Sequence, residues 1–175
     1  MTILSRENLR SLVCPLPAEM GFNFDLYRSV LQLGDKIYLF NPNGLLFRGH
    51  DREKYLEELI HSVSSGPFSS VAVVLLDPDK GIHNSKKSNK YIALSEVADL
   101  ARQNPNKTIA IYHHKNAGGF DYRTLLERLS HFNTFAYDFG AAAIFFIQNG
   151  TQPMTRIKDI LYSGLNPKRL LEKGI

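Results

Sequence analysis

Two acidic residues directly follow the most apolar run of the chain. Val71 to Leu76 is apolar without alternation, and Asp77 and Asp79 come next. A run of this kind, bounded by turn residues, indicates a strand that is buried on both faces of a sheet. In open α/β sheets, ligands bind just beyond the carboxyl ends of such strands. Two carboxylates at that position, with water in the remaining places, are suitable ligands for a hard cation such as Mg²⁺.

Basic and aromatic residues follow the two acids and add to the predicted site. Histidine titrates near neutral pH, so His114, after the next predicted strand, is a candidate to move a proton. Lys90 is a candidate to neutralise a phosphate. With Asp77 and Asp79 these residues form the predicted catalytic set, which suits metal-assisted attack of water on a phosphodiester. Four further residues are predicted to bind substrate: Lys86, Lys87, Tyr91 and Tyr112.

A structural interpretation of the same residues stays open. Asp77-Pro78-Asp79-x-Gly81 is also ordinary turn composition, and the lysines would then lie in a solvated loop. His113 is expected to be exposed or packed. Surface or helix-face positions are expected for His50, His61, His83 and His131. The sequence has no Walker A, G-x-S-x-G, C-x-x-C or H-E-x-x-H pattern, which disfavours serine and zinc hydrolases.

The elements that must position these residues alternate between strand and helix. A parallel pair of strands needs a crossover of about a dozen residues, which a helix supplies. We therefore expect an α/β fold: a three-layer, mostly parallel, doubly wound sheet that ends in a C-terminal antiparallel hairpin. Residues 1–150 are expected to form a single domain, and 151–175 a tail with a short helix. The predicted strands are 36–40, which ends in a turn at 41–44, 71–76, 108–112, 134–137 and 141–147. The predicted helices are 25–33, 51–63, which Asp51 can cap, and two that are capped by Ser95 and Asp121.

Composition limits the classes of protein to which this chain can belong. The 175 residues, 43% hydrophobic and 22% charged, are typical of one soluble globular domain. A net charge of +4 permits contact with nucleic acid or another polyanion. No signal peptide or membrane span is evident, so a cytoplasmic protein without a membrane partner is expected. The single cysteine, Cys14, fits a reducing compartment and is expected to pack as a small apolar residue at the N-terminal edge.

The order of elements resembles the C-terminal half of Rossmann-like, S-adenosylmethionine-dependent methyltransferases. Both have a buried strand that ends in Asp-Pro, here Asp77-Pro78, then a helix, a strand, a helix and a closing hairpin. The resemblance implies a methyltransferase-like fold with a truncated N-terminal half, and S-adenosylmethionine as a candidate cofactor beside Mg²⁺. Asp79 and Lys80 stand where the family's Asp/Asn-Pro-Pro-aromatic motif has its second proline and its aromatic residue. No glycine-rich cofactor turn follows the first predicted strand.

Local motifs resemble a second group, a family of bacterial and phage proteins without an assigned function. The matching segments are 77–82 (DPDKGI), 86–91 (KKSNKY) and 112–114 (YHH), within the region 71–147. This resemblance implies a phage-related origin and brings no reaction with it.

Two classes of function are therefore expected. The first is an enzyme that acts on nucleic acid or a nucleotide, either methyltransferase-like or a metal-dependent phosphodiester hydrolase that uses Asp77 and Asp79. The second is a non-catalytic module that binds a nucleotide or a protein at the same strand ends.

Overall fold

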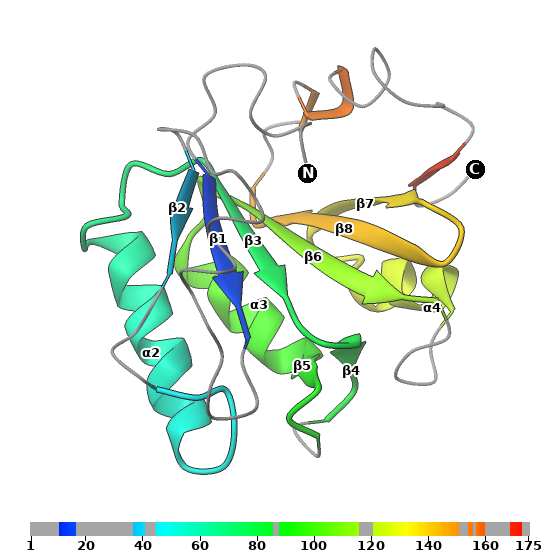
Figure 1. Cartoon of the computed structure of the whole chain (residues 1–175). Helices are drawn as coiled ribbons and strands as arrows, with labels where there is room; N and C mark the ends of the chain where they lie inside the picture. Colours follow the sequence, from blue (N-terminus) through cyan, green and yellow to red (C-terminus); the bar gives the residue numbers. More distant parts are fainter. Residues whose placement is uncertain are drawn as a thin grey trace.

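A seven-stranded sheet forms the centre of the molecule (Figure 1). The computed structural model describes residues 11–16, 37–40, 45–85, 88–115, 121–150, 154–155, 157–159 and 169–172. The strands lie in the order β2-β1-β3-β6-β8-β7-β9. Their bounds are β1 Ser11–Pro15, β2 Ile37–Leu39, β3 Val73–Asp77, β6 Thr108–His114, β7 Asn133–Asp138, β8 Ala142–Gln148 and β9 Leu170–Glu172.

Most strands of this sheet run in the same direction. The pairs β2–β1, β1–β3 and β3–β6 are parallel, whereas β6–β8, β8–β7 and β7–β9 are antiparallel. Since β7 is antiparallel to a strand that is itself antiparallel to β6, it shares the direction of the first four. The predicted mostly parallel sheet and the closing β7–β8 hairpin are confirmed. The strand β9, within the predicted tail, adds a seventh strand at one edge.

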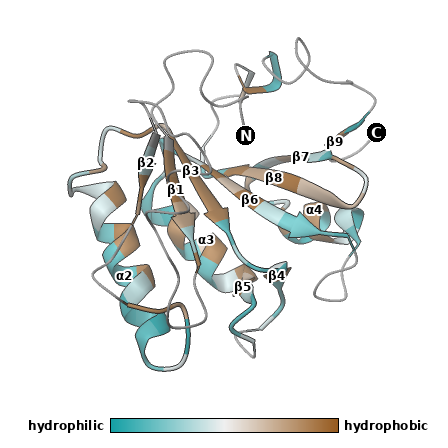
Figure 2. Cartoon of the chain, in the orientation of Figure 1, coloured by the Kyte–Doolittle hydropathy of each residue, from teal (hydrophilic) through white to brown (hydrophobic). Residues whose placement is uncertain are grey.

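The described helices cover one face of the sheet. They are α2 (Asp51–Ser64), α3 (Leu94–Gln103) and α4 (Tyr122–Arg128). Apolar side chains of all three share one hydrophobic core with alternate residues of the strands. On the opposite face, Met154 and Ile157 pack against residues of β1, β3, β7 and β8. The helical layer that a doubly wound sheet needs on that second face stays a prediction. Figure 2 shows that β1 and β3, at the centre of this packing, are predominantly hydrophobic.

Two of the three predicted helix caps are wrong. Asp51 is the first residue of α2, after His50, and no side chain caps this helix. Ser95 lies inside α3, whose start is stabilised instead by Glu96, because its carboxylate accepts a hydrogen bond from the Ala93 N–H at 2.7 Å. Asp121 caps α4 as predicted, with its Oδ1 2.7 Å from the Thr124 nitrogen. That bond holds the pKa of the Asp121 carboxyl below its ordinary value.

Several observed elements were not predicted, and some predicted elements fall outside the described residues. The strand β1 and the short parallel pair β4 (Gly81–His83) and β5 (Tyr91–Ala93) were not predicted. The predicted helix 25–33 and turn 41–44 are outside the described residues, as is much of the short C-terminal helix. No described helix is long and apolar enough to cross a membrane.

Cys14 lies in the interior of the sheet rather than at its edge, because β1 runs between β2 and β3. Its side chain is fully buried, and burial raises the pKa of the thiol well above its ordinary value. The thiol is therefore protonated at neutral pH, in agreement with its interpretation as a small apolar residue. Beside it, the Tyr55 hydroxyl donates to the Pro15 carbonyl at 2.7 Å and so ties α2 to the end of β1.

A buried histidine attaches β4 to β6. His113 is fully buried, and its Nδ1 accepts a hydrogen bond from the Ile82 N–H at 3.0 Å. Its ring also contacts the rings of Tyr122 and Phe145, with centroids 6.0 and 5.7 Å away. Gly81 allows this close approach, because its φ is +117° and a Cβ there would lie 2.8 Å from the His113 Cα. Of the two positions expected for His113, exposed or packed, the structure shows the packed one.

We expect Gly81→Ala to destabilise the fold more than Gly140→Ala. Both glycines have positive φ, +117° and +98°, but a Cβ at Gly140 would meet nothing within 4 Å. The backbone strain of about 1–3 kcal/mol is common to both variants. The clash with His113 should add roughly 1–3 kcal/mol to the first alone. Urea denaturation measures the difference, and equal losses of stability would contradict the close packing of β4 on β6.

Candidate functional site

The carboxyl ends of β3 and β6 lie next to each other in the sheet. Leu76 pairs with Ile111, so Asp77 and Tyr112 stand one residue beyond the last pair on each strand. Side chains alternate along a strand, and these two therefore face the same side. Both are half-buried. The structure thus brings the first predicted acid beside a predicted substrate-binding residue.

The end of β6 carries an aromatic pair that faces away from the helices. The rings of Tyr112 and His114 meet edge to face, with centroids 5.0 Å apart. His114 is exposed, whereas His113 between them points into the helix-covered core. This alternation explains why neighbouring histidines differ so much in exposure, and it leaves His114 accessible to a ligand.

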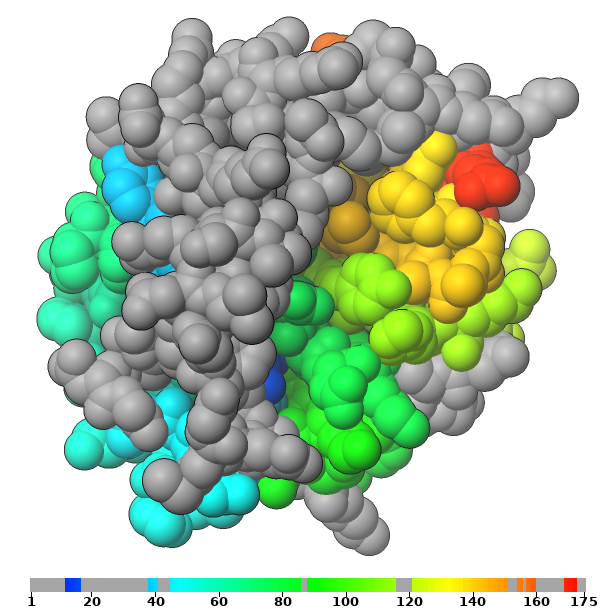
Figure 3. Space-filling model, in the orientation of Figure 1, coloured from blue at the N-terminus to red at the C-terminus, as the bar shows by residue number. Residues whose placement is uncertain are grey.

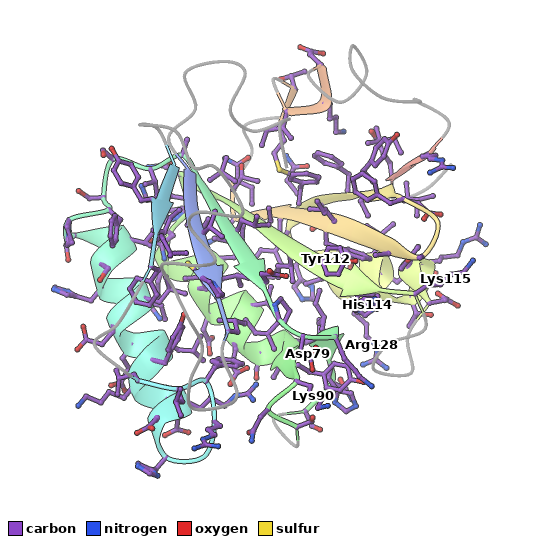
Figure 4. The ribbon with its side chains drawn as sticks, in the orientation of Figure 1. Asp79, Lys90, Tyr112, His114, Lys115 and Arg128 are labelled. Carbon is purple, nitrogen blue, oxygen red and sulfur yellow. The ribbon has the colours of Figure 1, made fainter. Side chains whose placement is uncertain are left out.

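Backbone hydrogen bonds gather three of the predicted catalytic residues around Lys80. The Lys80 N–H donates to the Lys90 carbonyl at 2.9 Å, and the His114 N–H donates to the Lys80 carbonyl at 3.2 Å. The Lys90 ammonium lies 3.8 Å from the Asp79 carboxylate, and these side chains are 55% and 59% exposed. Figure 4 shows Asp79, Lys90 and His114 at this one end of the sheet.

Further basic residues that the sequence analysis did not select lie at the same place. Lys115 directly follows β6, and its N–H donates to the Ala141 carbonyl at 2.9 Å. The Arg128 guanidinium donates to the Asn84 side chain at 3.2 Å, which brings α4 beside the end of β4 (Figure 4). The signal that could have found Lys115 is its position directly after β6, and Lys80 lies three residues after the end of β3. We call this set the strand-end surface: Asp79, Lys80, Lys90, Tyr91, Tyr112, His114, Lys115 and Arg128.

Positive charge predominates on the strand-end surface. It carries four cations, Lys80, Lys90, Lys115 and Arg128, against the exposed carboxylate of Asp79 and the half-buried carboxylate of Asp77 beside it. Within the described ranges, neither Lys80 nor Lys115 takes part in an ion pair, and both are exposed. The predicted residues Lys86 and Lys87 are outside the described part of the chain. The arrangement can attract an anion without first breaking a strong salt bridge.

The predicted metal ligands Asp77 and Asp79 are not joined by further ligands. Among the described residues, no group of three or more His, Cys, Asp or Glu side chains is arranged to hold a metal ion. A Mg²⁺ ion at Asp77 and Asp79 would take most of its ligands from water, as this ion commonly does. The metal site stays a prediction. The other histidines behave as expected, with His50, His61 and His131 exposed and His83 half-buried.

A buried ion pair supports the segment that carries Lys90 and Tyr91. The Arg52 guanidinium binds the Glu96 carboxylate through two hydrogen bonds of 2.7 and 2.6 Å, and both side chains are almost fully buried. Arg52 also donates to the carbonyls of Ser88 and Tyr91 at 3.2 and 2.9 Å. Its guanidinium lies over the Phe47 ring at 4.2 Å. One core residue of α2 therefore fixes the backbone on both sides of Lys90.

The Tyr91 ring packs against the ring of His83. Its ring centroid lies 5.2 Å from that of His83, and both side chains are half-buried. Since β4 and β5 pair in parallel over only three residues, this contact adds stability to a short ladder. Tyr91 thus lies at the strand-end surface as part of a packed pair.

Comparison of the chain with protein-family models gives no match, and neither does comparison with the curated proteins. The candidate function therefore rests on the residues of the strand-end surface.

We expect Glu96→Gln to be far more destabilising than Asp99→Asn on the same helix. The first substitution leaves the buried Arg52 charge without its carboxylate, which costs about 3–5 kcal/mol. The second breaks a pair with Arg102 in which both side chains are more than half exposed, and should cost less than about 1 kcal/mol. Urea denaturation of both variants tests this, and a loss in Glu96→Gln as small as in the control would refute the supporting role of the pair.

Proposed function

We propose that the strand-end surface binds a phosphate-bearing ligand, a nucleotide or a nucleic acid. The observation that carries the proposal is the Tyr112–His114 ring pair, half-buried at Tyr112 and exposed at His114. Beside it lie Lys80 and Lys115, which form no ion pair within the described residues. Lysine ammonium groups attract phosphate oxygens, and aromatic rings stack on nucleobases. The two kinds of group that a nucleotide needs therefore lie side by side at one end of β6.

The location of the surface supports the same proposal. Asp77 ends β3, and Asp79 and Lys80 follow it. Lys115 follows β6, and these carboxyl ends belong to adjacent parallel strands. Open α/β sheets bind their ligands at such ends. The net charge of +4 favours association with a polyanion over long range.

The fold proposed for this chain is methyltransferase-like with a truncated N-terminal half. It is supported by the order β3, α3, β6, α4 and the closing β7–β8 hairpin, the same order on which the sequence resemblance rests. The substitutions in the Asp-Pro motif, Asp79 and Lys80, argue against amine methylation at this place. For that reason we place ligand binding ahead of methyl transfer.

Metal-dependent phosphodiester hydrolysis is the second candidate function. It is favoured by the position of the Asp79 carboxylate, which lies near the Lys90 ammonium. The backbone of Lys80, the next residue, accepts a hydrogen bond from the His114 N–H and so brings His114 to the same place. In such a reaction Asp77 and Asp79 would hold Mg²⁺, Lys90 would neutralise the phosphate and His114 would move the proton.

Calorimetric titration separates these functions. We expect heat of binding with a nucleotide such as ATP in the absence of metal, and none with S-adenosylmethionine alone. Heat with S-adenosylmethionine would favour the methyltransferase. Heat with Mg²⁺ that disappears in an Asp77→Asn/Asp79→Asn variant, together with cleavage of an oligonucleotide, would favour the hydrolase.

The cations of the surface give a second test. We expect Lys80→Ala/Lys115→Ala to weaken binding of a fluorescent oligonucleotide roughly tenfold or more, because two charge-assisted contacts are lost. The dependence of log K on log salt should also become shallower by about one for each lysine. Lys54→Ala, an exposed lysine of α2, is the matched control. Equal affinities of the double variant and the control, measured by fluorescence anisotropy, would reject the surface as the binding site.

A further inference from the structure

We propose that the ligand is a single-stranded nucleic acid and that Phe139, at the tip of the β7–β8 hairpin, is a second stacking platform for its bases. This inference rests on the proposed function and narrows its ligand. Phe139 is the one exposed large hydrophobic side chain in the described part of the chain, at 40% exposure.

The hairpin holds the Phe139 ring in place. The Phe139 N–H donates to the Ala142 carbonyl at 2.8 Å, and the Gly140 N–H donates to the Asp138 carboxylate at 2.6 Å. The ring packs against Tyr137 with centroids 4.9 Å apart. An aromatic ring whose backbone is fixed by such bonds loses little further entropy when a base stacks on it.

Phe139 and the Tyr112–His114 pair belong to the same face of the sheet. Tyr112 pairs with Ile144 of β8, which in turn pairs with Tyr137, the ring that supports Phe139. The two aromatic pairs are therefore two strand spacings apart, about 10 Å. Ile144 lies between Tyr112 and Tyr137, and the small side chain of Ala142 lies opposite His114.

A lysine follows β6 beside the hairpin tip. The Lys115 N–H is bonded to the Ala141 carbonyl, so the backbone of Lys115 lies next to the tip. In Figure 3 the atoms of β6, of the hairpin and of the segment around Lys80 and Lys90 form one continuous coloured face. Figure 4 shows Lys90, Asp79, His114 and Lys115 at this end of the sheet.

This arrangement suits a strand better than a mononucleotide. One base and its phosphates would occupy one aromatic pair and the lysines beside it, and would leave Phe139 unused. Two separate ring pairs, with cations at the same end of the sheet, match the successive bases and phosphates of a single strand. In a duplex the bases are stacked on one another, so exposed rings have no free base face to contact.

Fluorescence anisotropy with the full chain tests the proposal. The probes are a fluorescent ATP analogue, a labelled 12-nucleotide single strand and a duplex of the same length. We expect Phe139→Ala to weaken binding of the single strand roughly 5- to 100-fold, the range measured for removal of one stacked ring. It should leave the affinity for the ATP analogue unchanged.

The matched control is His131→Ala. His131 is an exposed ring that packs against Phe132, with centroids 5.5 Å apart, just before the start of β7 and thus at the opposite end of that strand. This variant should bind both probes like the unmodified chain. Phe139→Leu keeps an apolar side chain at the tip and should still lose most of the affinity that stacking supplies, and urea denaturation shows that each variant is folded.

The outcomes separate the two proposals. If the single strand binds no better than the ATP analogue, or Phe139→Ala binds it like the unmodified chain, the single-strand proposal is overturned while phosphate binding stands. Tighter binding of the duplex overturns it as well. If neither probe binds, or Lys80→Ala/Lys115→Ala changes nothing, the proposed function itself is rejected.

Discussion

The buried ion pair between Arg52 and Glu96 is the interaction on which the arrangement of the site depends. Removing two charges from water is costly, and only a well-formed set of hydrogen bonds offsets that cost. Here the set is extensive, because the guanidinium binds the carboxylate twice and donates to two backbone carbonyls, while Glu96 also accepts from the Ala93 N–H. The pair joins α2, the start of α3 and the segment 88–91 in one network. The position of Lys90 is therefore set from the core, although its own side chain is in water.

A second buried polar contact fixes the other half of the surface. The His113 imidazole, between the half-buried Tyr112 and the exposed His114, accepts a hydrogen bond from the Ile82 N–H and so holds β4 against β6. Gly81 makes this approach sterically feasible. Because the Lys80 backbone bridges Lys90 and His114, the two buried contacts meet at one residue of the surface. Core residues thus determine the spacing of the exposed groups, and a ligand meets groups whose backbone is already ordered.

The parts of this fold that the sequence predicted are those with strong local signals. The apolar run before Asp77, the strand before His114, the hairpin around Gly140 and the cap at Asp121 each follow from neighbouring residues. The strands β1, β4, β5 and β9 are only three to five residues long, so their sequences show little periodicity. They depend instead on pairing with distant segments. The predicted cap at Ser95 was wrong because Glu96, one residue later, accepts the Ala93 N–H, and α2 begins after His50 without a side-chain cap from the described residues. The buried state of Arg52 could not be predicted, since arginine is ordinarily exposed. Only the hairpin geometry reveals the exposure of Phe139.

The exposure of the charged groups bears on which chemistry this surface favours. Electrostatic stabilisation of a transition state is strongest where water is excluded. Asp79 and Lys90 are both more than half exposed and 3.8 Å apart, so water weakens their interaction with each other and with any reacting group. Binding has no such requirement, since several hydrated cations together give useful affinity for a polyanion. The weakness of each contact then favours a long ligand, which engages many of them at once. The exposure of these charged groups therefore argues against efficient catalysis by the described residues. It allows an extended, charged ligand to contact many of them at once.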